Sequence, residues 1–83
     1  MNKITIDEIV DVFTFSDQVL KMQKIKELVF QQRDYSFKPY ETKYSFDQTI
    51  QKHVEKRCPK RKGFTGEHIF DLVDRAMYKL NNY

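Results

Sequence analysis

The sequence predicts a small, mainly all-α domain of four helices, with an irregular or short β-hairpin aromatic segment between the second and the third. Two observations predict it. Apolar residues recur at intervals of three and four over most of the chain, and side chains that can cap a helix precede these stretches. With 83 residues, the chain is expected to form a single helical domain, residues 1–83, around one hydrophobic core.

The first helix is expected to follow Thr5. Thr5 and Glu8 fit a capping box, in which each side chain bonds the backbone N–H of the other residue. The apolar face of this helix is Ile6, Ile9, Val10 and Phe13.

A second, longer helix is expected to restart within residues 14–17 (TFSD) and to reach about Gln32. Its apolar stripe is Phe15, Val19, Met22, Ile25, Val29 and Phe30. Leu20 and Leu28 fall outside this stripe, so the following segment covers them or they are available to a partner.

The helical period disappears in residues 33–46. Aromatic residues alternate there with polar ones around Lys38 and Pro39, and the triplet YSF occurs twice. This pattern predicts two short extended pieces or a β-hairpin, with a packed irregular loop as the alternative.

A third helix is expected to begin near Ser45 or Asp47, because Ser45 and Gln48 fit a capping box. Its apolar residues are Phe46, Ile50, Val54 and Cys58. Pro59 should end it, since proline disfavours α geometry at the residue before it.

A fourth helix is expected from the cap Thr65, with Phe64 and Ile69 as a hydrophobic staple, to the end signal Asn81–Asn82. Its apolar face is Ile69, Leu72, Val73, Ala76, Met77 and Leu80. Asp71 and Arg75 would form an exposed i,i+4 pair on this helix.

Positive charge is concentrated where the third helix ends. Residues 51–83 hold eight Lys and Arg against four Asp and Glu, whereas residues 1–50 hold seven against eight. The densest part, here called the basic strip, is Lys52, Lys56, Arg57, Lys60, Arg61 and Lys62. Such a strip is typical of phosphate binding, which supplies the sequence-independent part of nucleic-acid affinity.

An ordinary surface is the alternative interpretation of the basic strip. Lys56 and Arg57 would complement the dipole of a helix C-terminus, and the acidic first helix could neutralise the strip within the fold through Asp7, Glu8 and Asp11. Lys60, Arg61 and Lys62 have no structural role that the sequence indicates, so the functional hypothesis narrows to these three residues.

The aromatic segment offers a second candidate surface. Exposed rings could stack on unpaired bases or contact a partner, and the candidates are Tyr35, Phe37, Tyr40 and Tyr44. The alternative is that these rings cover a small core.

No cofactor, metal site or catalytic residue is expected. His53, Cys58 and His68 are the soft ligand candidates, and their spacing matches no tetrahedral zinc pattern. No motif for phosphate-loop, dinucleotide or zinc-protease chemistry occurs. The chain is therefore not expected to be an enzyme.

These observations predict a small regulatory binding protein of the kind common in phages and mobile elements. Its partner is expected to be nucleic acid, with RNA favoured over DNA because no recognition helix is evident. The alternative is an inhibitor or adaptor that docks on an acidic surface of a larger host protein. The oligomeric state stays open, a homodimer included. The short apolar runs and the acidic N-terminus predict a soluble, cytoplasmic protein without a membrane partner.

Overall fold

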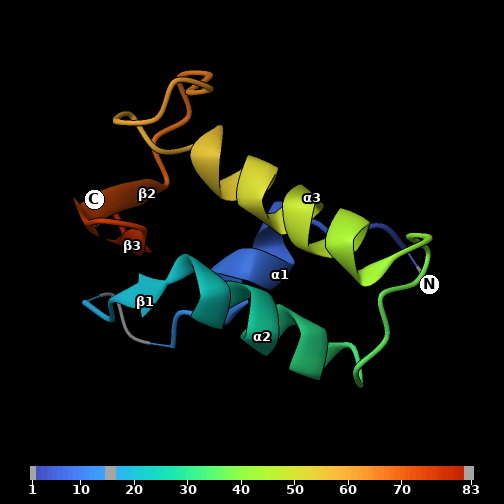
Figure 1. Ribbon diagram of the computed structural model, residues 1–83. Coiled ribbons are helices and arrows are strands. Elements are labelled where there is room, and N and C mark those ends of the chain that lie inside the picture. Colours follow the sequence, from blue (N-terminus) through green and yellow to red (C-terminus); the bar gives the residue numbers. More distant parts are fainter. Residues whose placement is uncertain (1, 15–16, 82–83) are drawn as a thin grey trace.

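The computed structural model describes residues 2–14 and 17–81. In these residues it contains three helices and a three-stranded antiparallel sheet, so the prediction of a four-helix, all-α domain is wrong. The elements are α1 (Ile6–Asp11), β1 (Leu20–Lys21), α2 (Met22–Gln32), α3 (Lys43–Glu55), β2 (Phe70–Asp74) and β3 (Met77–Leu80). Figure 1 shows the sheet at one end of the helices.

Helix α1 forms as its sequence predicts. Thr5 Oγ1 accepts a hydrogen bond from the Glu8 N–H, and Glu8 Oε1 accepts one from the Thr5 N–H, which completes the capping box. The helix ends at Asp11, before Phe13, but Phe13 is still buried in the core.

The second helix begins later than predicted. Phe15 and Ser16, within the predicted start, lie outside the described residues. Leu20 and Lys21 instead form the short strand β1, which pairs antiparallel with β3. Leu20, which the sequence left open to a partner, is buried there, and the Met22 N–H donates to the Ala76 carbonyl at 2.8 Å. A cross-strand partner therefore overrides local helix propensity at this point.

The predicted hairpin in residues 33–46 is wrong. Residues 33–42 form turns and irregular backbone, as the alternative prediction had it, and α3 starts at Lys43. Thr42, not Ser45, caps α3: its side chain accepts from the Ser45 N–H at 3.0 Å.

The predicted fourth helix is wrong, because strands β2 and β3 form a hairpin over most of it. The fully buried residues of the hairpin are Phe70 and Tyr78, and neither belongs to the apolar face that a helix would require. At the turn, the Arg75 N–H donates to Asp74 Oδ1 and Ala76 has a positive φ of 52°. Arg75 therefore lies in a tight turn and does not form a helical pair with Asp71.

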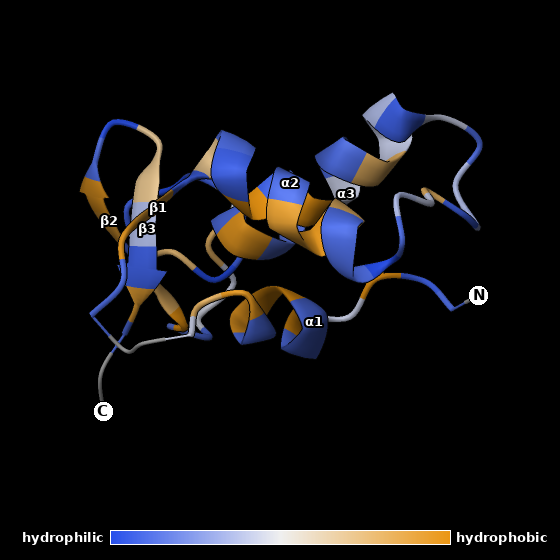
Figure 2. Cartoon of the chain, turned by 90° about the horizontal axis from the view of Figure 1, so that it is seen from below, coloured by the Kyte–Doolittle hydropathy of each residue, from blue (hydrophilic) through white to orange (hydrophobic). Residues whose placement is uncertain are grey.

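One core joins the helices to the sheet. Figure 2 shows hydrophobic positions gathered on the inner sides of α1 and α2. The four residues of the apolar face predicted for the third helix are each fully buried, although α3 ends at Glu55 and Cys58 lies beyond it. These are Phe46, Ile50, Val54 and Cys58.

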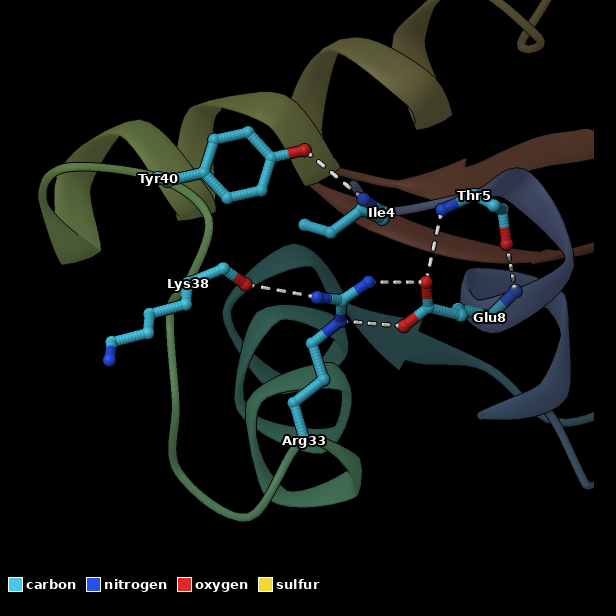
Figure 3. A network of polar contacts seen from close by, with 6 residues as sticks. All are labelled: Ile4, Thr5, Glu8, Arg33, Lys38 and Tyr40. Atoms are coloured by element: carbon cyan, nitrogen blue, oxygen red, sulfur yellow. Dashed lines mark hydrogen bonds and ion pairs between the residues drawn. The ribbon is translucent and has the colours of Figure 1, made fainter. Parts of the chain in front are cut away.

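A partly buried ion pair holds α1 against the end of α2. Arg33 Nε and Nη2 donate to the two Glu8 carboxylate oxygens at 2.7 and 2.6 Å, and Arg33 Nη1 donates to the Lys38 carbonyl (Figure 3). The Arg33 hydrogen bonds lower the pKa of Glu8 below its ordinary value. Glu8 is thus engaged by a residue outside the basic strip.

The sheet brings together strands from both halves of the chain. The elements run α1, β1, α2, α3, β2, β3, and β3 lies between β1 and β2 in the sheet. The link between α2 and α3, residues 33–42, is longer than the usual turn of three or four residues. None of the helices in the described residues is long and apolar enough to cross a membrane.

Candidate nucleic-acid interface

Helix α3 buries one face and presents the opposite one. Because the turn angle is about 100° per residue, the buried line through Phe46, Ile50 and Val54 directs Gln48 and Lys52 outward. The exposed neighbours on that face are Tyr44, Ser45 and Lys56, with Tyr44 at 72% exposure. The face is polar and basic, with hydroxyl and amide groups toward the N-terminus and lysines toward the C-terminus.

The two carboxylates of α3 are engaged within the helix. Asp47 accepts two bonds from Lys43 Nζ, at 2.7 and 2.9 Å, and Glu55 accepts one from Gln51 Nε2 at 3.2 Å. Lys43 therefore offsets the charge of Asp47, whereas Glu55, bonded to a neutral amide, keeps its negative charge near Lys52 and Lys56.

The rest of the basic strip lies in the loop between α3 and β2, here called loop 56–69. Thr65 closes it by donating from both its N–H and its Oγ1 to the Lys56 carbonyl, at 2.8 and 3.0 Å. The Arg57 carbonyl accepts from the N–H groups of Ile69 and Phe70, both at 3.0 Å. Thr65, predicted as the cap of a fourth helix, therefore satisfies the C-terminal end of α3. In Figure 1 this loop extends past the end of α3.

Arg57 is held inside the fold. Its guanidinium donates to Glu67 Oε1 and to the His53 carbonyl, both at 2.9 Å, and lies 3.2 Å from His53 Nδ1. Burial, followed by the positive charges of Arg57 and Lys56, lowers the pKa of His53. The neutral imidazole can therefore accept from Arg57, and Arg57 positions the loop.

Arg61 also has a structural partner, so the prediction that it has no structural role is wrong. Its Nε donates to the Tyr78 hydroxyl at 2.8 Å, and its guanidinium lies 5.6 Å from the centroid of that ring. Tyr78 is fully buried, and its burial raises the pKa of the phenol. Arg61 thus ties loop 56–69 to the centre of the sheet.

The lysines of the basic strip remain open to a partner. Lys52, Lys56, Lys60 and Lys62 are exposed. Within the described part of the chain, their amines take part in no ion pair or hydrogen bond, and none joins Asp7 or Asp11 to the strip. Ion pairs from Asp7, Glu8 and Asp11 to the strip, which the sequence left open, are therefore absent from the described residues, and the carboxylate paired with the strip is Glu67, through Arg57. Beside the strip lies a hollow of about 390 Å³, lined by Glu55, Lys60, Arg61, Lys62 and Gly63.

The four candidate aromatic residues do not form one platform. The Tyr40 hydroxyl accepts from the Ile4 N–H at 3.1 Å, and both Tyr40 and Phe37 pack against the core. Tyr35 is 68% exposed and contacts Phe30 edge-to-face. Tyr44 alone of the four adjoins the basic face, because it lies in α3. The sequence did not single out Ser45 and Gln48 as part of the outer face of α3. Their helical spacing from Lys52, seven and four residues, could have indicated that they share its face.

The soft ligand candidates are dispersed. Cys58 is buried, His53 contacts Arg57, and His68 Nε2 lies 2.6 Å from Asp71 Oδ1. Among the described residues, no group of three or more His, Cys, Asp or Glu side chains is placed to hold a metal ion.

Comparisons with known proteins assign no function to the chain, so a functional proposal rests on the geometry of the site. The chain matches no family model, no curated protein and no solved structure.

Proposed function

We propose that this chain is a non-enzymatic nucleic-acid-binding protein that places α3 in the major groove of duplex DNA. The observation that carries the proposal is the outer face of α3, where the half-buried Gln48 and the exposed Lys52 lie opposite the buried line and Lys56 continues the face. In helix-turn-helix proteins the second helix enters the major groove, and its N-terminal residues contact base edges. Here those residues are Tyr44, Ser45 and Gln48.

Lysines supply the phosphate contacts in this arrangement. Lys52 and Lys56 flank the helix face, and Lys60 and Lys62 extend the positive surface along loop 56–69. Arg57 and Arg61 keep that loop in place through Glu67 and Tyr78. This separation of roles is the same as in other proteins that bind duplex DNA, in which phosphate contacts fix the position of the protein and polar side chains contact the bases.

Duplex DNA has more support than RNA, which the sequence favoured because no recognition helix was evident. The B-form major groove admits an α-helix, whereas the A-form major groove is too deep and narrow for side chains to read. Single-stranded RNA would need a platform of exposed rings to stack on, and of the four candidates Tyr35 and Tyr44 are exposed whereas Phe37 and Tyr40 are partly covered by the core.

A protein-docking role has less support from the geometry. The apolar side chains that would have carried it are Leu20, which is buried in β1, and Leu28, which packs partly against the core. An acidic protein surface could still contact the basic strip, and the experiment below includes that outcome.

Fluorescence anisotropy with a mixed-sequence duplex tests the proposal. The double variant Lys52→Ser/Lys56→Ser should weaken binding and reduce the slope of log K against log salt by about 0.9 for each phosphate that is no longer neutralised by a lysine. The control variant Lys3→Ser/Lys24→Ser removes the same charge from exposed sites outside the proposed interface, and it should change the slope little.

Equal losses of affinity for both double variants would show that only net charge matters and would overturn the proposed interface. Tighter binding to single-stranded RNA of the same sequence would overturn the choice of duplex DNA. If neither nucleic acid binds at 50 mM salt, which is about where nonspecific binding is strong, the proposal fails and the protein-docking class gains support.

A further inference from the structure

A second hollow, of about 430 Å³, lies beside the hairpin where loop 56–69 approaches it. Its lining is mostly apolar, and Val73 contributes a side chain that is 51% exposed. The lining residues are Pro59, Lys60, His68, Asp71, Leu72, Val73 and Lys79. Its volume lies within the range of about 300 to 1,000 Å³ that small-molecule pockets occupy.

Two amines give this hollow its charge. Within the described residues, neither Lys60 nor Lys79 takes part in an ion pair or a side-chain hydrogen bond. Asp71 lies opposite Lys79 across the hairpin, but its Oδ1 is 2.6 Å from His68 Nε2, so this oxygen already has a partner. The lining therefore combines apolar surface with two amines and one carboxylate, that of Asp71, so its amines outnumber its carboxylates.

We infer that this hollow binds a small organic monoanion with a compact apolar body and one carboxylate. Leu72, Val73 and Pro59 would cover the body, and the amines of Lys60 and Lys79 would bond the carboxylate. A dianionic phosphate fits less well, because Asp71 in the same lining offsets one of the two amines and leaves one positive charge for the ligand.

Lys60 links this site to the proposed nucleic-acid interface. It belongs to the basic strip and lines both hollows, the one beside the strip and the one beside the hairpin. A carboxylate bound to Lys60 would compete with a phosphate for the same amine, so the ligand and the duplex weaken each other's binding reciprocally. This regulatory part rests on the proposed function, whereas the ligand site itself does not.

Methyl NMR of the full chain tests the site without nucleic acid, with benzoate as the probe and benzamide as its neutral near-isostere. Benzoate should shift the methyl signals of Leu72 and Val73 saturably, and benzamide should bind several-fold more weakly. The variant Lys60→Ser/Lys79→Ser should reduce benzoate affinity to that of benzamide. The control Lys3→Ser/Lys24→Ser should leave both affinities unchanged.

Equal affinity for benzoate and benzamide in the native chain would overturn the anion assignment. Unsaturable shifts, or equal shifts at the distant methyl groups of Val12 and Leu28, would overturn the site. A fall in benzoate affinity in the Lys3→Ser/Lys24→Ser control would also count against it, because it would reflect net charge alone.

Anisotropy with the duplex then tests the coupling. Saturating benzoate, compared with sodium chloride at equal ionic strength, should reduce the salt slope by about 0.9, the value for one phosphate contact. Lys79→Ser should abolish this effect and leave duplex affinity without benzoate unchanged. An unchanged slope in the native chain would overturn the coupling. A chain that binds benzoate but no duplex would leave the site intact and refute the proposed function alone.

Discussion

Arginine and lysine have different roles within the basic strip. Arg57 bonds His53 and Glu67, and Arg61 bonds Tyr78, so the planar guanidinium groups fix the shape of loop 56–69. The lysines of the strip project into solvent, as expected of a flexible, strongly hydrated amine. At the residue scale, the fold therefore separates positive charges that position the loop from those that can meet a phosphate.

The pKa of His53 is a measure of its burial and of its contact with Arg57. Its pKa in the folded chain should lie below the ordinary value of 6.5, because burial and then Arg57 and Lys56 disfavour the imidazolium. The unfolded chain then takes up a proton first, so this contribution to stability is present above the ordinary pKa and is lost as the pH falls through the folded pKa. An NMR pH titration of the histidine ring signals measures the midpoint of His53, which should lie below 6.5.

The variant Arg57→Gln serves as the control for this titration. It removes one positive neighbour but leaves the ring half-buried, so the pKa of His53 should rise and still stay below 6.5. A midpoint for His53 at or above 6.5 in the native chain would contradict its burial, and a midpoint that Arg57→Gln leaves unchanged would contradict its contact with Arg57.

At the scale of the elements, the C-terminal segment forms the hairpin of β2 and β3 and not a helix. Its register places Leu72 opposite Tyr78, and an irregularity follows between Leu72 and Asp74. Ala76, in the turn, adopts a left-handed conformation that an L-residue with a side chain reaches only with strain. The same alanine would favour a helix if the C-terminal element were helical.

Ala76→Gly therefore has opposite effects in the two structures. In the hairpin it should raise the free energy of unfolding by about 0.5 to 1 kcal/mol, because glycine tolerates the positive φ. In a helix it would lower this free energy by about 1 kcal/mol. Urea denaturation measures the difference, and Gln48→Gly within α3 serves as the helical control, with an expected loss of about 0.5 to 1 kcal/mol.

Contacts between distant parts of the sequence hold the whole molecule together. Leu20 in β1 pairs with Tyr78 in β3, and Arg33 at the end of α2 bonds Glu8 in α1. The core also receives side chains from each of the three helices and from the sheet. Stability therefore depends on residues whose importance their local sequence does not indicate.

Leu20→Ala tests this dependence. It should lower the free energy of unfolding by about 2 to 4 kcal/mol, because it removes a buried side chain between the sheet and the helices. The neighbouring Val19 is 38% exposed, so Val19→Ala should cost less than about 1 kcal/mol in the same urea denaturation. Similar losses of stability for both variants would contradict the burial of Leu20.

Predictions from local chemistry were correct where neighbouring residues decide the outcome. The capping box of Thr5 and Glu8 depends on residues three apart, and the buried face of α3 depends on intervals of four. The charge density of the basic strip is likewise a property of the sequence. These features required no knowledge of what packs against them.

Only the tertiary structure decided the C-terminal hairpin and the candidate interface. The apolar residues from Ile69 to Leu80 fit a helical period, but β3 gains hydrogen-bonded partners on both sides, β1 and β2, and buries Tyr78. The roles of Arg57 and Arg61 depend on Glu67 and Tyr78, which no local pattern pairs with them. By itself, the sequence determined α1, the existence but not the bounds of α2 and α3, the buried residues of α3 and the location of the positive charge. Packing between distant segments decided which of those charges remain exposed, because burial and strand pairing are properties of the whole fold.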